Sequence, residues 1–233
     1  LIFYRAVEQA AGSPDNVLLG LNLRGDAFRH FRCYGQLVLD EFKLDELITD
    51  NNGWWANKFG WQLGLKYFDA FGREDLQLQV EYNSVRPYTY SHRDSSARYT
   101  HYRQPLAHPL GANFREFLAL ARWQPLPRWR LQARALWMHY GEDEPSRNWG
   151  HNPLLSSNTR VQEYNNSTTQ GVDTRTLLLG AVLSHELFHN AFLELELLYR
   201  DQDSVLPERD LRTLIFSAGF RMNVSRREWA PGM

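Results

Sequence analysis

Residues 192–200 read Phe-Leu-Glu-Leu-Glu-Leu-Leu-Tyr-Arg, a stretch in which apolar and charged side chains alternate. Successive side chains of a β-strand point to opposite faces of the sheet, so this order separates the two kinds of side chain. The apolar face carries Leu193, Leu195, Leu197 and Tyr199, and the polar face carries Glu194, Glu196 and Arg200. The stretch therefore predicts a strand with one apolar and one polar face.

The same period of two recurs along the whole chain. It is clear in residues 76–83, 129–137 and 213–222, and less regular in 17–24, 31–42, 58–69, 114–123 and 176–185. Together with 192–200, these segments predict nine strands, and residues 1–7 read as the end of a tenth. We therefore predict an all-β fold in which residues 1–233 form a single domain of antiparallel strands.

The connections between these segments alternate strictly in length. Short connections are expected near 25–29, 70–75, 124–128 and 186–190, and longer ones at 43–57, 86–112, 141–174 and 201–209. A transmembrane β-barrel has short periplasmic turns and long extracellular loops, which is the same pattern. A soluble sandwich explains the alternation of side chains but not that of the loops. We expect an antiparallel transmembrane β-barrel in the bacterial outer membrane, with residue 233 on the periplasmic side.

Composition agrees with a folded protein at an interface. Aromatic residues make up 14% of the chain, and Trp and Tyr are enriched where one end of a ring is in apolar surroundings and the other is in contact with water.

The net charge of −1 gives no general attraction to nucleic acid. Cys33 is the only cysteine, so no intrachain disulfide forms. The first residues, Leu1 to Arg5, do not have the pattern of a signal peptide and resemble the middle of a strand, so we expect this sequence to be the C-terminal part of a larger barrel.

Four segments carry a resemblance to a known family. They read YGQLVLDEF at 34–42, GWWANKFGWQLGLKYFD at 53–69, LQVEYNSVRPYTYSH at 78–92 and YTHYRQPLAHPLGANFREF at 99–117. These segments resemble the capsule-assembly (Wzi-type) family of outer-membrane barrels, including its gliding-motility-associated relatives. The resemblance implies a barrel wider than ten strands that organises surface polysaccharide or takes part in adhesion. It implies no catalytic residues, and after about residue 175 only the strand pattern remains.

The long loops are the candidate binding surface, because loops on a rigid scaffold usually carry binding residues. Aromatic faces can stack on sugar rings while amides and hydroxyls pair with sugar hydroxyls. The alternative is that these side chains only pack the loops together and seal the barrel mouth. The candidate residues for a glycan or a cell-surface protein are Trp54, Trp55, Arg86, Tyr88, Tyr90, His92, Tyr99, His101, Tyr102, Trp149 and Tyr164.

Residues 185–189 match the zinc-hydrolase pattern H-E-x-x-H, in which His185 and His189 bind zinc on one face of a helix and Glu186 is the general base. The motif falls where the strand pattern requires a short turn, and Asn190 suits a turn. We therefore expect a turn, no cofactor and no enzymatic activity, with a zinc-dependent hydrolase as the alternative.

The polar face leaves a further alternative, a channel for polar solutes. It carries Lys66, Glu81, Arg130, Arg134, Glu194, Glu196 and Arg221, so both signs of charge are represented. Opposite charges of similar number can pair across a lumen, and no single-sign lining indicates ion selectivity. The sequence thus favours a scaffold or binding barrel that contacts outer-membrane lipid.

Overall fold

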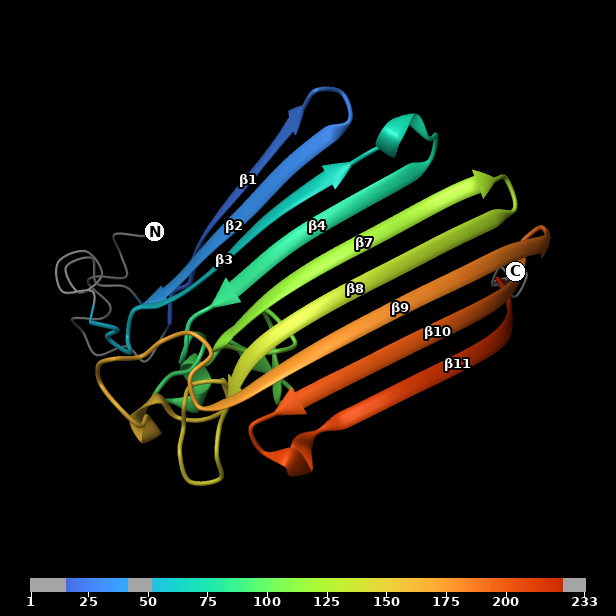
Figure 1. The fold of residues 1–233 in the computed structure, drawn as a ribbon. Coiled ribbons are helices and arrows are strands. Elements are labelled where there is room, and N and C mark those ends of the chain that lie inside the picture. The colour runs from blue at the N-terminus through green and yellow to red at the C-terminus, as the bar shows by residue number, and fades with distance from the viewer. Residues whose placement is uncertain (1–15, 42–51, 224–233) are drawn as a thin grey trace, which may run out of the picture.

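The computed structural model describes residues 16–41 and 52–223. Nine long strands form one antiparallel sheet in the order β1-β2-β3-β4-β7-β8-β9-β10-β11 (Figure 1). They are β1 (Leu19–Ala27), β2 (Phe31–Glu41), β3 (Lys58–Tyr67), β4 (Leu76–Val85), β7 (Phe114–Leu126), β8 (Trp129–Glu142), β9 (Val172–Phe188), β10 (Ala191–Ser204) and β11 (Leu211–Met222). A small hairpin of β5 (Thr100–His101) and β6 (Gln104–Pro105) lies between β4 and β7. Each long strand pairs with its neighbours along the chain, so the sheet is a meander.

Nine strands at the expected positions are confirmed, as is the all-β class. Several strands run further than the side-chain alternation indicated; residues 176–185, for example, lie within a strand that spans Val172–Phe188. The extra residues 172–175 follow the long connection 143–171, where polar side chains on both faces interrupt the alternation while backbone pairing continues. Residues 186–188 extend the strand to the turn at 189–190. The proposed tenth strand at residues 1–7 and the placement of residue 233 lie outside the described residues.

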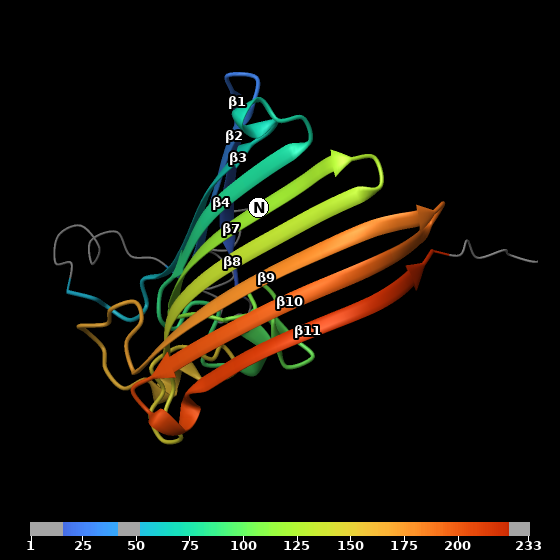
Figure 2. The same ribbon diagram turned by 45° about the vertical axis from the view of Figure 1, so that its right-hand side comes forward.

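The expected closed barrel is not what the described strands form. β1 pairs only with β2, and β11 pairs only with β10, so this sheet is open and has two edges. The strands curve together like a section of a cylinder wall (Figures 1 and 2). Among the described residues, no helix is long and apolar enough to cross a membrane. The only helical elements there are single 3-10 turns: η1 (Ala70–Gly72), η2 (Ser95–Ala97), η3 (Ser157–Thr159) and η4 (Pro207–Arg209).

The connections alternate between short and long, as the sequence predicts. Residues 28–30, 68–75, 127–128 and 189–190 form the short connections, and all lie at one end of the sheet, here called the turn end (Figure 1). The two-residue turn at 189–190 places Asn190 at φ 64°, a left-handed conformation that Asn tolerates better than most residues. Residues 86–113 and 143–171 are the long connections at the opposite end, the loop end, where the shorter 205–210 also lies.

One face of the sheet is apolar and exposed. Residues paired across strands share a face, so the register places Leu131, Leu183 and Leu195 side by side, and the same face continues to both edges. Many of its large apolar side chains are more than a third exposed; among the most exposed are Leu23 at 65%, Leu63 at 61% and Phe216 at 69%. We call this the outer face.

The opposite face, the inner face, is polar and cross-linked by hydrogen bonds. Tyr34 on β2 donates to Glu81 on β4 at 2.5 Å, passing over β3 between them. Gly64 of β3 lies beneath this contact, and a Cβ there would overlap the Tyr34 ring. Gly180 of β9 likewise lies beneath the Arg134 side chain, which a Cβ at this position would overlap. The Arg134 guanidinium nitrogen is 3.8 Å from the Glu196 carboxylate oxygen.

The buried core lies at the loop end of the inner face. Val85, Tyr90, Ala112, Phe114 and Tyr140 form a buried apolar cluster between the sheet and the loops. Partly buried Leu18, Val38, Leu110 and Met138 pack around it. The core therefore holds the long loops onto the sheet, whereas the outer face contributes none of it.

Candidate functional site

Three loop segments meet at the loop end and form a cap, defined here as residues 52–57, 86–113 and 143–171. Backbone hydrogen bonds join the first segment to the third, from Trp55 N to Glu163 O at 2.9 Å and from Asn166 N to Gly53 O at 2.9 Å. The second segment joins the third through Tyr88 N to Gly150 O at 2.9 Å. The cap is therefore an ordered unit built from segments that lie far apart in the chain.

Asn113 clamps the cap to the end of the sheet. Its amide nitrogen donates to Gly141 O at 2.8 Å and to Gln170 O at 2.7 Å. Its amide oxygen accepts from the backbone N–H groups of Thr169 and Gln170, at 2.8 and 3.2 Å. This fully buried side chain thus makes four hydrogen bonds, the full capacity of an amide with two donors and two acceptor positions.

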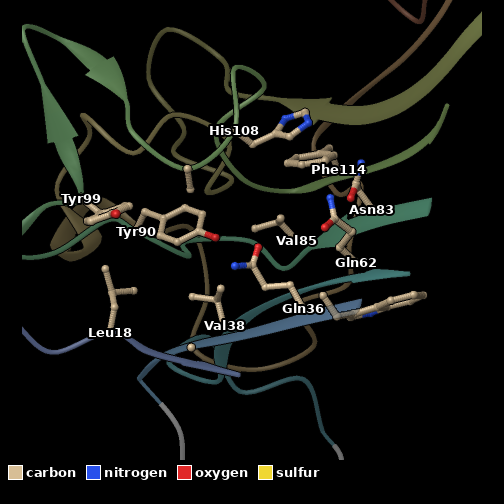
Figure 3. A pocket seen from close by; sticks show the side chains of 14 residues that line it. Leu18, Gln36, Val38, Gln62, Asn83, Val85, Tyr90, Tyr99, His108 and Phe114 are labelled. Atoms are coloured by element: carbon tan, nitrogen blue, oxygen red, sulfur yellow. The ribbon is translucent and has the colours of Figure 1, made fainter. Parts of the chain in front are cut away.

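A cavity of about 390 Å³ lies between the cap and the inner face (Figure 3). Gln36, Gln62 and Asn83 line it from the strands, and Tyr90, Tyr99 and His108 line it from the cap. Phe114 forms part of its wall, with the His108 ring stacked at a centroid distance of 4.5 Å. The volume lies in the range of small-ligand pockets, and the lining combines aromatic faces with amides.

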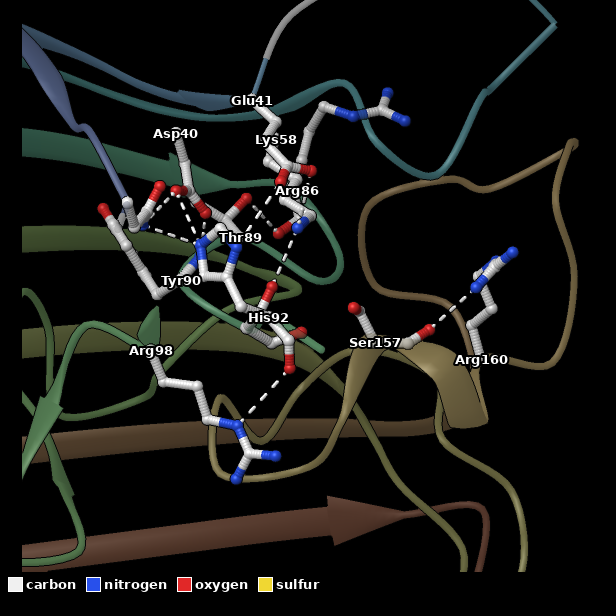
Figure 4. Close-up of polar contacts among 12 residues, drawn as sticks. Asp40, Glu41, Lys58, Arg86, Thr89, Tyr90, His92, Arg98, Ser157 and Arg160 are labelled. Carbon is white, nitrogen blue, oxygen red and sulfur yellow. Dashed lines mark hydrogen bonds and ion pairs between the residues drawn. The ribbon is translucent and has the colours of Figure 1, made fainter. Parts of the chain in front are cut away.

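A buried ionic cluster anchors the cap to the end of β2 (Figure 4). The side chain of Lys58 is 1% exposed, and its ammonium lies 2.9 Å from the Glu41 carboxylate. It also donates to the carbonyl oxygen of Ser91 in the cap at 2.8 Å. A lysine ammonium is almost never buried in proteins unless it is paired. Here Glu41 ties the start of β3 to the end of β2, and Ser91 ties it to residues 86–113.

His92 lies next to this lysine between two carboxylates. Its Nε2 is 2.9 Å from Asp40 and its Nδ1 is 3.4 Å from Glu41. Burial disfavours the charged ring, but the hydrogen bonds to Asp40 and Glu41 outweigh it and raise the pKa of His92 above its ordinary value. The protonated ring is therefore the form that fits this cluster.

Several predicted binding residues are structural parts of the cap. Tyr88 and Tyr90 are buried; the Tyr88 hydroxyl donates to Asn148 O at 2.9 Å, and Tyr90 N donates to Asp40 at 2.8 Å. Arg86 donates from Nε to Asn57 O at 2.9 Å. These residues fit the alternative reading, in which aromatic and basic side chains pack the loops together.

Trp55 is half-buried beneath cations. The guanidinium of Arg160 lies 4.2 Å from its ring centroid, the Lys58 ammonium lies 4.9 Å away, and Trp54 contacts it edge-on at 6.4 Å. Arg147 covers Trp149 in the same way at 4.6 Å. The indole rings of Trp55 and Trp149 thus each make a cation–π contact with an arginine of the cap.

The remaining predicted residues are on the surface of the cap. Tyr102 is 88% exposed and contacts the exposed His101 ring at a centroid distance of 4.2 Å with the planes tilted by 60°, and Tyr164 is 42% exposed. Tyr99 is 40% exposed but also lines the cavity beside Tyr90. The structure therefore brings Tyr90 and Tyr99 to one cavity and leaves Tyr102 and Tyr164 outside it.

A second, more open hollow of about 780 Å³ lies beside the ionic cluster. Its lining is charged and polar and includes Arg93, Asp94 and Arg98, together with Trp55 and His92. Arg98 is engaged by the carbonyl oxygens of His92 and Leu154. This hollow is a wide surface feature with a charged lining, whereas the cavity between the cap and the inner face has an aromatic and amide lining.

The H-E-x-x-H motif is not on a helix. His185, Glu186 and Phe188 belong to β9, and His189 and Asn190 form the turn to β10. His185 stacks on Trp129 at 4.2 Å on the outer face, and Glu186 pairs with Phe192 on the inner face. Adjacent strand residues point to opposite faces, so the motif cannot converge on one metal as it does on a helix. The described residues contain no group of three potential metal ligands.

The charged inner-face residues predicted from the sequence lie on one face, and several are paired. Arg221 donates to Glu194 at 2.9 Å, and Glu81 accepts from Tyr34 and from Gln62 at 2.9 Å. Sequence reasoning missed Asp40, Lys58 and Asn113 as cap anchors. Asp40 is the last residue but one of β2 and Lys58 is the first of β3, so both lie where the alternation stops, which is the one local signal that marks them.

Comparisons of the chain with protein-family models, with curated protein sequences and with solved structures return no match.

Proposed function

We propose that this sheet is a section of the wall of a bacterial outer-membrane β-barrel, and that its cap holds surface polysaccharide or an adhesion partner. The observation that carries the proposal is the outer face, where apolar side chains from all nine long strands are exposed together. Soluble proteins rarely expose such a continuous apolar surface, whereas a barrel wall turns it to lipid.

The dimensions of the outer face support this proposal. Trp129 and Trp137 bound the apolar part of β8, and Trp123 and Phe117 bound that of β7. Trp137 lies eight residues after Trp129, and at about 3.4 Å per residue this separation is about 27 Å along β8. A tilt of roughly 40° reduces this to about 21 Å, close to the apolar band of about 25 Å in outer-membrane barrels, which aromatic girdles flank.

Charged side chains on the outer face occur beyond the loop-end aromatic residues. Arg115, Asp173, Arg175 and Asp203 follow the apolar stretch towards the loop end, and Arg175 and Asp173 pair at 3.3 Å. Between the two aromatic boundaries of β8 the outward residues are only Leu131, Ala133 and Ala135. This order matches a hydrocarbon layer with a polar interface above it.

A binding or scaffold role is favoured over an open channel by the cap. The cap packs on the inner face through a buried apolar cluster and the hydrogen bond from Lys58 to the Ser91 carbonyl oxygen, so it covers the loop end of the wall. The resemblance of residues 34–117 to the capsule-assembly family supports polysaccharide as the partner. The role proposed is non-enzymatic.

The native Cys33 offers a direct test, because it is exposed and its register partner Leu65 is an outer-face residue. A nitroxide attached to Cys33 in protein reconstituted into phosphatidylcholine vesicles is expected to be relaxed strongly by oxygen and weakly by a water-soluble nickel chelate. The control is a Cys33→Ser, Gln36→Cys variant, whose label points to the inner face and is expected to show the reverse. Equal nickel relaxation at both sites, or recovery of monomeric protein without detergent, would contradict the proposal.

A further inference from the structure

We propose that the cavity between the cap and the inner face is the glycan subsite, and that it takes an uncharged sugar residue approached from the inner side of the wall. This inference rests on the proposed function and names the ligand class and the position of its site. The exposed cap aromatics Tyr102 and Tyr164 lie outside this subsite.

The cavity provides flat aromatic surface of the kind that sugar rings contact. Tyr90 and Tyr99 lie 5.8 Å apart with their planes tilted by 37°, so they form an angled corner (Figure 3). Tyr90 is almost fully buried, whereas Tyr99 is 40% exposed and has surface to offer. Apolar burial of a sugar ring face against such a corner is the favourable term in binding.

Amide groups supply the complementary polar surface. The Gln36 amide nitrogen donates to Asn22 at 2.8 Å, and that of Gln62 donates to Glu81 at 2.9 Å. The Asn83 amide nitrogen donates to Glu81 and to Glu116, both at 2.9 Å. Each nitrogen thus donates to a protein acceptor, and Asn83 uses both of its N–H groups in this way. The amide oxygens can therefore accept hydrogen bonds from a ligand. Such oxygens accept hydrogen bonds from sugar hydroxyls.

The hydroxyl of Tyr90 adds a donor between these amides. Figure 3 shows its ring extending from the cap towards Gln36 and Val38. Burial raises the pKa of Tyr90 to about 12, so the hydroxyl keeps its proton at neutral pH. The subsite thus combines fixed acceptors with at least one donor, as a polyhydroxylated ligand requires.

Charge selects against an acidic sugar. Among the described residues that line the cavity, none is Lys, Arg, Asp or Glu, and the one imidazole is already paired. His108 accepts from Leu110 N at its Nδ1, so its Nε2 carries the hydrogen that faces Glu116 at 3.2 Å. A carboxylate or sulfate in this cavity would be desolvated without a cation, which is costly. The open hollow with Arg93 and Arg98 lacks this restriction.

The experiment is a glycan array probed with the full chain in a detergent without a sugar headgroup. The array carries neutral hexose, deoxyhexose and N-acetylhexosamine oligosaccharides beside uronate and sulfated ones of equal length. We expect binding to neutral members, and the best of them is then titrated by calorimetry. Tyr99→Leu and Gln36→Leu are each expected to weaken the dissociation constant at least tenfold, with Tyr102→Leu as the matched control that leaves it unchanged.

Binding only to acidic glycans, binding to no glycan, or loss of binding with Tyr102→Leu but not Tyr99→Leu would each overturn the subsite. Strand content by circular dichroism shows that each variant is folded. The Cys33 label separates the two proposals: a lipid-facing Cys33 with no neutral-glycan binding rejects the subsite alone, whereas a water-facing Cys33 rejects the barrel wall itself.

Discussion

Tyr34 on β2 and Glu81 on β4 are joined by a 2.5 Å hydrogen bond that crosses the intervening strand β3 above Gly64. Gln79 donates to the same Tyr34 hydroxyl at 2.9 Å. A contact between strands that are not neighbours ties three strands together on the inner face. Curvature of the sheet brings such side chains closer on its concave side, so the contact and the curved wall support each other.

Adding one methyl group at Gly64 is expected to destabilise the sheet, because the new Cβ overlaps the Tyr34 ring and displaces its bond to Glu81. A hydrogen bond to a charged group contributes about 1.5–3 kcal/mol, and Gly64→Ala is expected to lose a similar amount of unfolding free energy. Urea unfolding in detergent measures it. Gly219→Ala is the control: Gly219 is also on the inner face, but nothing lies within 4 Å of its Cβ position. Equal stability of the two variants would refute the crossing contact.

Asn113→Ala is expected to release residues 143–171 from the sheet. The change removes four hydrogen bonds and leaves backbone groups of buried Gly141 and of partly buried Thr169 and Gln170 without their partner. Each unsatisfied buried group costs about 1–3 kcal/mol, although water entering the opened cap offsets part of this. Hydrogen exchange is expected to accelerate in 143–171. Asn158→Ala, at an exposed position in the same loop, is expected to leave exchange unchanged.

The cap is expected to weaken as the pH rises through the pKa of His92. The pKa of His92 is higher in the folded state than in the unfolded chain, so the stabilisation is complete below about pH 6.5 and is lost above the folded value. Proteolytic nicking of residues 86–113 is expected to be faster at pH 8.5 than at pH 6. His92→Gln is expected to abolish this difference, and His101→Gln, at an exposed site, to retain it. If the nicking rate of His92→Gln still depended on pH, a group other than His92 would be responsible for the pH dependence.

A charge in the middle of the outer face is expected to oppose membrane insertion. Ala133 lies midway between Trp129 and Trp137, with Ala121 and Ala181 as its register partners. Arginine at the midplane of a barrel wall costs about 2–4 kcal/mol, so Ala133→Arg is expected to shift the urea midpoint in lipid vesicles downward. Gln132→Arg places the same charge one residue away on the inner face and is expected to have a much smaller effect. A similar loss in both variants would show that the outer face does not contact lipid.

Chelation is expected to leave the protein unchanged. His185 and Glu186 point to opposite faces of β9, so the H-E-x-x-H residues do not share a metal. Elemental analysis of purified protein is expected to show substoichiometric zinc, and EDTA is expected not to lower the thermal midpoint. Zinc bound one to one and lost in His185→Ala would restore the hydrolase alternative.

Alternation of side chains predicted the strands because it is a local property of each segment: Leu193 to Arg200 carry both faces of β10 in their own order. The cap was predictable only as a set of long loops. Its anchors join residues distant in sequence, such as Lys58 to Ser91 and Asn113 to Gln170, and such pairs leave no periodic signal. The burial of Tyr88, Tyr90 and His92 could not be predicted for the same reason. The sequence of a loop does not indicate whether an aromatic side chain packs inward or faces solvent.

The two open edges of the sheet have a consequence that concerns direction. β1 and β11 both run from the loop end towards the turn end, because an odd number of strands in a meander begins and finishes with the same polarity. Joining these edges directly, or joining two copies edge to edge in one membrane, would create parallel seams in an otherwise antiparallel wall. An entirely antiparallel barrel therefore needs an odd number of additional strands between β11 and β1. The total is then even, as in bacterial single-chain barrels.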